Sequence, residues 1–116
     1  MEKKIVVLVR QNGLGTVLPQ DADFGHDMFD KFLHTLEVLR AKPQAICLYT
    51  EGVKLACQGS PVVPGLRLLG AMGVRILICT SCLEYYGLKE KVEVGEVCGM
   101  RDIVDLLVNS DKVITV

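Results

Sequence analysis

Three short runs of mostly Val, Ile and Leu, at residues 4–9, 45–50 and 74–79, constrain the fold more than any other feature. Apolar side chains fill almost every position of each run, as is typical of strands that are covered on both faces. Between the first two runs, apolar residues recur at helical spacing over residues 27–41. Strands that alternate with helices predict an α/β fold, a three-layer α/β/α sandwich around a parallel sheet.

The rest of the chain continues this alternation. Residues 11–23 form a loop rich in turn residues, and residues 53–57 form a short stretch after a turn at Glu51-Gly52. The other predicted elements are helices at residues 61–72, 81–86 and 100–109 and strands at residues 92–94 and 112–116. No change of composition divides the 116 residues, so we expect a single domain over residues 1–116.

Charge and hydropathy exclude several classes of partner. The net charge is −1 and the pI about 6.1, and no stripe of Lys and Arg offers a surface to nucleic acid. Half of the residues are hydrophobic, yet no run approaches the roughly 20 apolar residues that span a bilayer. The apolar run near the N-terminus is too short for a signal peptide and lacks a small-residue cleavage site. We therefore expect a cytoplasmic protein that binds neither nucleic acid nor membranes.

A Cys-x-x-Cys pair lies where the third apolar run ends and a helix is expected to begin. Cys79 ends the predicted strand, and Cys82 lies one helical turn further on. In a parallel sheet, sites form at the carboxyl ends of the strands. Thr80 and Ser81 are expected to cap the helix, and their amides to stabilise a thiolate or persulfide on Cys79. The alternative is that both cysteines are small core residues.

The other cysteines are weaker candidates. Cys47 lies inside the second strand and is expected in the core, and Cys57 is expected to be structural. Cys98 falls in a predicted loop at residues 95–99, on the same sheet edge as Cys79, and is a candidate partner for it.

A zinc site is not expected. One Cys-x-x-Cys supplies two ligands, and a structural zinc site needs two more from a second close pair. Neither Cys57 nor Cys98 has a neighbouring ligand, and His26 and His34 are spaced poorly for one helical face.

Two further side chains are candidate binding residues. His26 precedes the predicted first long helix and could contact a ligand, and Glu51 follows the second strand at the same edge. A surface histidine and a solvated turn carboxylate are the alternatives. Residues 12–15 (NGLG) resemble the start of a dinucleotide fingerprint, but Leu18 occupies the place of its third glycine, so we interpret this loop as a rim of the site.

The motifs LYTEGVKL at residues 48–55 and ILICTSCLEYYGL at residues 76–88 resemble the DsrE/DsrF-like sulfur-relay family. Within that family, they are most similar to the DsrE-like C-terminal domain of YedF-type selenium-metabolism proteins. Further similar stretches are residues 24–25, 91–97 and 111–114. The resemblance implies a five-stranded, mainly parallel sheet with flavodoxin-like architecture, a tendency to form homo-oligomers, and persulfide transfer. It also implies that Cys79 carries the sulfur and that Cys82 is the second cysteine of the YedF-like branch.

These observations predict a sulfur-relay protein. Cys79 would accept sulfur from a donor persulfide and pass it to an acceptor protein or small thiol, and Cys82 would resolve the persulfide or tune the pKa of Cys79. This chemistry needs no metal or organic cofactor. Two alternatives remain open: a non-catalytic oligomeric binding module, and a dithiol redox protein that uses Cys79 and Cys82.

Overall fold

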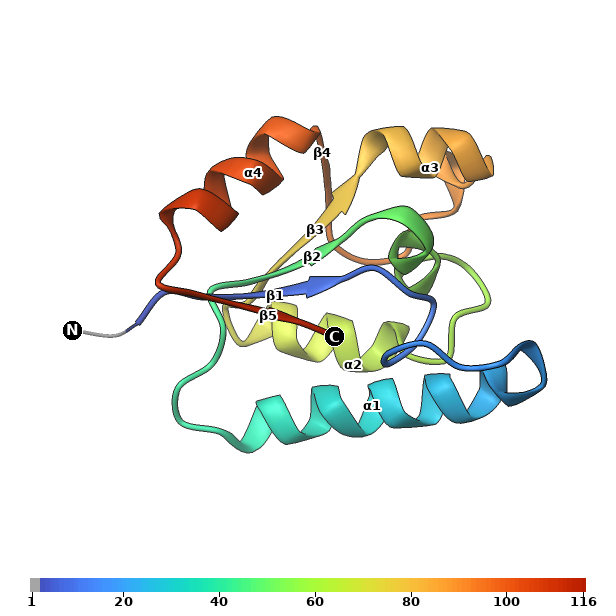
Figure 1. The fold of residues 1–116 in the computed structure, drawn as a ribbon, viewed down its shortest axis with the longest axis horizontal. Coiled ribbons are helices and arrows are strands. Elements are labelled where there is room, and N and C mark those ends of the chain that lie inside the picture. The colour runs from blue at the N-terminus through green and yellow to red at the C-terminus, as the bar shows by residue number, and fades with distance from the viewer. Residues whose placement is uncertain (1–2) are drawn as a thin grey trace.

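The computed structural model describes residues 3–116, which form a five-stranded sheet with all strands parallel (Figure 1). The strands are β1 (Ile5–Val9), β2 (Ala45–Leu48), β3 (Arg75–Cys79), β4 (Glu96–Cys98) and β5 (Lys112–Thr115). Their order across the sheet is β4-β3-β2-β1-β5. The predicted α/β architecture is confirmed, and the sheet is wholly rather than mainly parallel.

Helices cover the sheet from both sides (Figure 1). Helices α1 (Ala22–Val38) and α2 (Val63–Ala71) pack together on one face, and α3 (Thr80–Tyr86) and α4 (Met100–Asn109) lie on the other. Three 3-10 segments complete the elements: η1 (Pro19–Asp21), η2 (Thr50–Ala56) and η3 (Lys89–Lys91). None of the helices within residues 3–116 is both long and apolar enough to cross a membrane.

The core lies on both faces of the three central strands. Residues 6–9 of β1, 45–48 of β2 and 76–79 of β3 are all buried. Each helix contributes fully buried side chains to the same core: Phe29 and Leu33 from α1, Leu66 and Leu69 from α2, Leu83 from α3 and Ile103 from α4. The continuous apolar runs of the sequence therefore correspond to strands that are packed on both sides.

The first long helix begins earlier than predicted. It starts at Ala22 rather than at residue 27, directly after η1, and ends at Val38 rather than at residue 41. Gly25, in the first turns of α1, is buried against the preceding loop, and its carbonyl accepts a hydrogen bond from Leu14 at 3.1 Å. A side chain at Gly13 would meet the Gly25 backbone at 3.0 Å. The two glycines thus let the loop pack closely on the helix, a tertiary contact that the apolar pattern does not show.

The fourth strand was predicted at the wrong residues. Val92 makes only an isolated antiparallel bridge with Cys57, whereas the ladder with β3 is formed by β4, Glu96–Cys98. Between them, Gly95 has a φ of 95°, and a side chain there would lie 2.9 Å from the Ile76 carbonyl oxygen. Cys98, predicted in a loop, therefore ends a strand. The other predicted helix and strand boundaries agree with the structure to within two residues.

Candidate functional site

Cys79 lies at the junction of β3 and α3. It is the last residue of the strand and the N-cap of the helix, so the chain passes from sheet to helix without a loop. Only 1% of Cys79 is exposed, and its side chain belongs to the core. A reagent from solvent therefore cannot reach the Cys79 sulfur directly unless the structure around it opens.

Cys82 lies one turn further along α3, close enough to Cys79 for that thiol to raise the pKa of Cys82. The three-residue spacing thus brings the two sulfurs together, as expected across one helical turn. Cys82 is half-buried, so it is the thiol of the pair that faces solvent. The Thr50 amide donates a hydrogen bond to Cys82 Sγ at 3.0 Å.

Thr50 was not predicted as a site residue. It is the only non-glycine residue with a positive φ in residues 3–116, at 46°. Its Oγ1 lies 2.9 Å from the Arg10 carbonyl oxygen and 2.7 Å from its neighbour's, at Tyr49. These contacts hold the start of η2 so that the Thr50 amide faces the sulfur. A strained backbone position next to reactive groups is a common feature of functional sites.

The predicted capping by Thr80 and Ser81 is wrong. The N-terminus of α3 has no side-chain cap, and the Thr80 hydroxyl donates instead to the Cys98 carbonyl at 3.0 Å. Ser81 is exposed. The amide that donates to Cys82 Sγ comes from Thr50 on η2, and stabilisation of a Cys79 thiolate by the Thr80 and Ser81 amides stays a prediction. Sequence spacing within one motif cannot show a donor that comes from a different element.

The thiol of Cys82 is a weaker acid than a free cysteine. Burial raises its pKa above the usual value of 9.0, and the neighbouring Cys79 thiol raises it further, while the Thr50 amide opposes both. At neutral pH Cys82 is therefore mostly protonated, and a nearby hydrogen-bond donor favours the small thiolate fraction.

Cys98 is the third cysteine at the junction of β3 and α3, and we call Cys79, Cys82 and Cys98 the cysteine corner. It is the Cα partner of Cys79 in the β3–β4 ladder and is half-buried. Burial raises the pKa of Cys98, and the nearby carboxylates Asp102 and Glu96 raise it further. The structure thus brings Cys98 next to the predicted pair, as its position on the same sheet edge indicated.

The two remaining cysteines lie apart from this corner. Cys47 is fully buried in β2, and burial raises its pKa to about 11. Cys57 is buried, its Sγ donates to the Val53 carbonyl at 3.3 Å, and burial raises its pKa too. Within residues 3–116, no three metal-binding side chains gather closely enough to hold an ion.

A shallow hollow of about 280 Å³ opens beside Cys82, between η2 and α3. Thr50, Ser81, Tyr85 and Tyr86 form its other walls. The two tyrosine rings pack edge to face with their centroids 5.1 Å apart. An apolar hollow at a half-buried thiol provides room for a bound sulfur or the end of a thiol compound.

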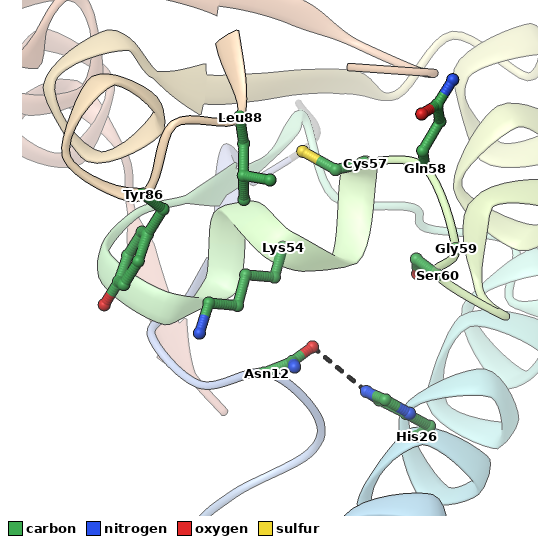
Figure 2. Close-up of a pocket in the computed structure, with 9 residues that line it drawn as sticks. All are labelled: Asn12, His26, Lys54, Cys57, Gln58, Gly59, Ser60, Tyr86 and Leu88. Carbon is green, nitrogen blue, oxygen red and sulfur yellow. Dashed lines mark hydrogen bonds between the residues drawn. The ribbon is translucent and has the colours of Figure 1, made fainter. Parts of the chain in front are cut away.

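A larger pocket of about 430 Å³ holds the predicted residue His26 (Figure 2). His26 Nε2 lies 3.1 Å from Asn12 Oδ1 in this pocket, and Lys54 lines the same pocket. Glu51 is exposed and forms an ion pair with Lys54 at 2.9 Å. Neither His26 nor Glu51 lines the hollow at Cys82. Lys54 and Tyr86 were missed as site residues, although both lie inside the two motifs.

Comparison with known proteins gives a family and a fold. The model of the DsrE/DsrF-like family matches residues 3–116. The fold is similar to that of the ychN protein from E. coli (16% identity, TM-score 0.69), over 98% of this chain and 99% of that one.

Two proteins of unknown function have similar structures. MTH1491 from Methanobacterium thermoautotrophicum has 16% identity and a TM-score of 0.69, with 99% and 100% of the two chains covered. BT1422 from Bacteroides thetaiotaomicron has 21% identity and a TM-score of 0.67, with 98% and 95% covered. No curated protein matches the sequence.

Proposed function

The chain belongs to the DsrE/DsrF-like family, broadly one of sulfur-relay proteins, and on that premise we propose that its Cys79–Cys82 pair accepts and passes on sulfur. One observation carries the proposal. Two cysteines lie one helical turn apart at the carboxyl edge of the sheet, and the outer one receives an amide hydrogen bond beside an open hollow. Inert core cysteines need neither the donor nor the hollow.

The two thiols have different roles in this proposal. The thiolate of Cys82, which faces solvent, attacks the outer sulfur of a donor persulfide, takes that sulfur with its hydrogen, and releases the donor thiolate. The thiolate of Cys79 then attacks the outer sulfur of the Cys82 persulfide and restores the Cys82 thiolate. Each step breaks one sulfur–sulfur bond and forms another, so no oxidant is required. The burial of Cys79 shields the stored sulfur from water and stray thiols.

Partners follow from the same chemistry. We propose donor and acceptor proteins or small thiols as partners, and a cytoplasmic location, because a reduced pair is needed. The second cysteine supports membership of the YedF-like branch. Exposed apolar side chains on α4 and β5, Val104, Val108 and Val113, support a homo-oligomer.

Mass spectrometry after incubation with cysteine persulfide tests the proposal. The wild type is expected to gain one sulfur atom, mapped to Cys79, and the Cys79→Ser variant to retain no stable sulfur. Loading of Cys82→Ser should be at least about tenfold slower, because its only route to Cys79 is transient opening of the buried corner. Cys47→Ala is the matched control and should load like the wild type.

Two outcomes would reject this reading. If the wild type gains no sulfur and its thiols react like free cysteine, the chain is better explained as a binding module. If the only product is a stable Cys79–Cys82 disulfide, the pair is a redox dithiol. Wild-type loading rates in Cys82→Ser would refute the entry role of Cys82.

A further inference from the structure

Residues of η2 and α3 connect the Cys79–Cys82 pair with the larger pocket. Segments η2 and α3 pack against each other. The Thr50 amide meets Cys82, and four residues further along both segments, Lys54 Nζ lies 4.5 Å from the centre of the Tyr86 ring. Tyr86 forms part of the wall of both hollows. About one helical turn therefore separates the outer thiol from the larger pocket.

The larger pocket combines polar groups with an apolar floor (Figure 2). Lys54, Asn12 and His26 lie around one part, and Cys57 and Leu88 supply an apolar part, with the Cys57 sulfur directed toward Leu88. Its volume of about 430 Å³ is in the range of small-molecule sites, which place a few polar groups in a mostly apolar hollow.

The charges of this pocket favour an anion. Its lining includes the ammonium group of Lys54 and the imidazole of His26, and no carboxylate. Within residues 3–116, the acidic group bound to Lys54 is Glu51, which lies outside the lining and is exposed. A ligand carboxylate could take over the role of Glu51 at Lys54 and make a charge-assisted hydrogen bond.

We propose that this pocket binds the carboxylate of a low-molecular-weight thiol and directs its sulfur past Tyr86 to the cysteine pair. The inference rests on the proposed function, because it names a substrate class for the same site. The Cys82 thiolate first takes the sulfur back from Cys79, in the reverse of the loading step, and the thiolate of the bound compound then attacks the outer sulfur of the Cys82 persulfide. The protein sulfur–sulfur bond breaks with its electron pair on the cysteine, and the compound leaves as a persulfide that carries the hydrogen. Charge and atoms balance without a further reactant.

Binding is tested first, on the reduced full chain, by nitrogen-edited NMR titration with mercaptoacetate and with its neutral analogue mercaptoethanol. Mercaptoacetate is expected to shift the amides around Asn12, His26 and Lys54 in a saturable way, and mercaptoethanol to leave them unchanged. Lys54→Gln should weaken binding about tenfold, the equivalent of one charge-assisted hydrogen bond. Glu51→Gln should tighten it, because it frees Lys54. Lys31→Gln, a lysine exposed on α1, is the matched control and should bind like the wild type.

Discharge is tested second, on protein loaded with persulfide. Sulfur should pass to mercaptoacetate faster than to mercaptoethanol at equal thiolate concentration, and Lys54→Gln should remove the difference. Absent binding together with equal discharge rates would overturn the pocket assignment and leave the sulfur relay intact. Saturable binding in a protein that never loads sulfur would uphold the pocket as an anion site and refute the relay. Equal binding of both thiols would overturn the role of the carboxylate.

Discussion

The centre of the sheet and its two edges are built differently. In β1, β2 and β3 nearly every residue is buried, whereas no residue of β4 or β5 is fully buried. Helix α4, which joins the two edge strands, buries only Ile103. The centre therefore holds most of the packing energy, and the edges leave backbone and apolar side chains open to partners.

The cysteine corner lies on the border between these regions. Cys79 ends a central strand and is buried, while its ladder partner Cys98 ends an edge strand and is half-buried. Cys79 thus belongs to the closely packed centre, and its neighbour Cys98 belongs to the less packed edge, where a partner can approach. Four measurements test how strongly the central strands and the edge strands differ in reactivity and stability.

The largest expected difference is in thiol alkylation. Cys47 in β2 is fully buried with a pKa of about 11, so it reacts only after the chain unfolds. An unfolding free energy of at least about 5 kcal/mol corresponds to a factor of more than a thousand. Cys98 is therefore expected to react with iodoacetamide at least about a thousandfold faster, as measured by mass spectrometry of peptides. In strong denaturant the two rates should converge; similar rates in native buffer would contradict a rigid centre.

The next largest difference is in the free energy of unfolding lost when either of the two isoleucines that flank Val7 is truncated. Ile46 in β2 and Ile114 in β5 are both ladder partners of Val7, and Ile46 is fully buried while Ile114 is partly exposed. Ile46→Ala should lower the free energy of unfolding by about 3 kcal/mol and Ile114→Ala by about 1 kcal/mol. Urea denaturation measures both. An equal loss in Ile114→Ala would mean that a second copy covers the β5 edge in solution.

Two glycines give a smaller contrast. An added Cβ at Gly52 in η2 would overlap the carbonyl oxygen of Val9 at the end of β1, whereas nothing lies within 4 Å of one at Gly99, before α4. Gly52→Ala should destabilise the protein by about 2 kcal/mol, because backbone must move. Gly99→Ala, whose φ of −82° suits any residue, should be neutral. Thermal unfolding would show whether the junction of β1 and η2 is as rigid as this predicts.

The smallest effect concerns the Arg75–Glu96 ion pair between β3 and β4, 2.8 Å long and about half exposed. The hydrogen bond from Arg75 lowers the pKa of Glu96 in the folded chain below the ordinary value of 4.5. The ion pair therefore stabilises the fold fully above pH 4.5. This stabilisation is lost as the pH falls through the lower pKa of the folded state. Glu96→Gln should cost at most about 0.5 kcal/mol at neutral pH, and nothing near pH 2. Chemical denaturation at both pH values measures this; a loss above about 2 kcal/mol would show an edge as strongly coupled as the centre.

The same border separates what the sequence predicts well from what it predicts poorly. A strand packed on both faces has a continuous run of apolar residues in the sequence, so β1, β2 and β3 could be located from the sequence to within two residues. At the edge, Val92 and Val94 carry the apolar pattern, but the ladder is formed by Glu96, Val97 and Cys98. Half-exposed strands follow the hydrogen-bond register, which hydropathy does not encode.

The candidate site divides in a similar way. The contact between Cys79 and Cys82 follows from helical spacing within one motif, and could be predicted. Thr50 and Lys54 come from a separate segment that packs against α3 only in the folded chain. Their roles depend on that tertiary contact and, for Thr50, on a left-handed backbone that no residue preference indicates.

Thr50 also bears on how quickly the sulfur site can act. A threonine in the left-handed region costs about 1–2 kcal/mol, and the hydrogen bond that its hydroxyl donates to the carbonyl oxygen of Arg10 or Tyr49 offsets this when the chain folds. Its N–H dipole is thus already oriented before any charge develops on the outer thiol. Preorganisation of this kind spares the reaction the solvent rearrangement that the same ionisation would require in bulk water.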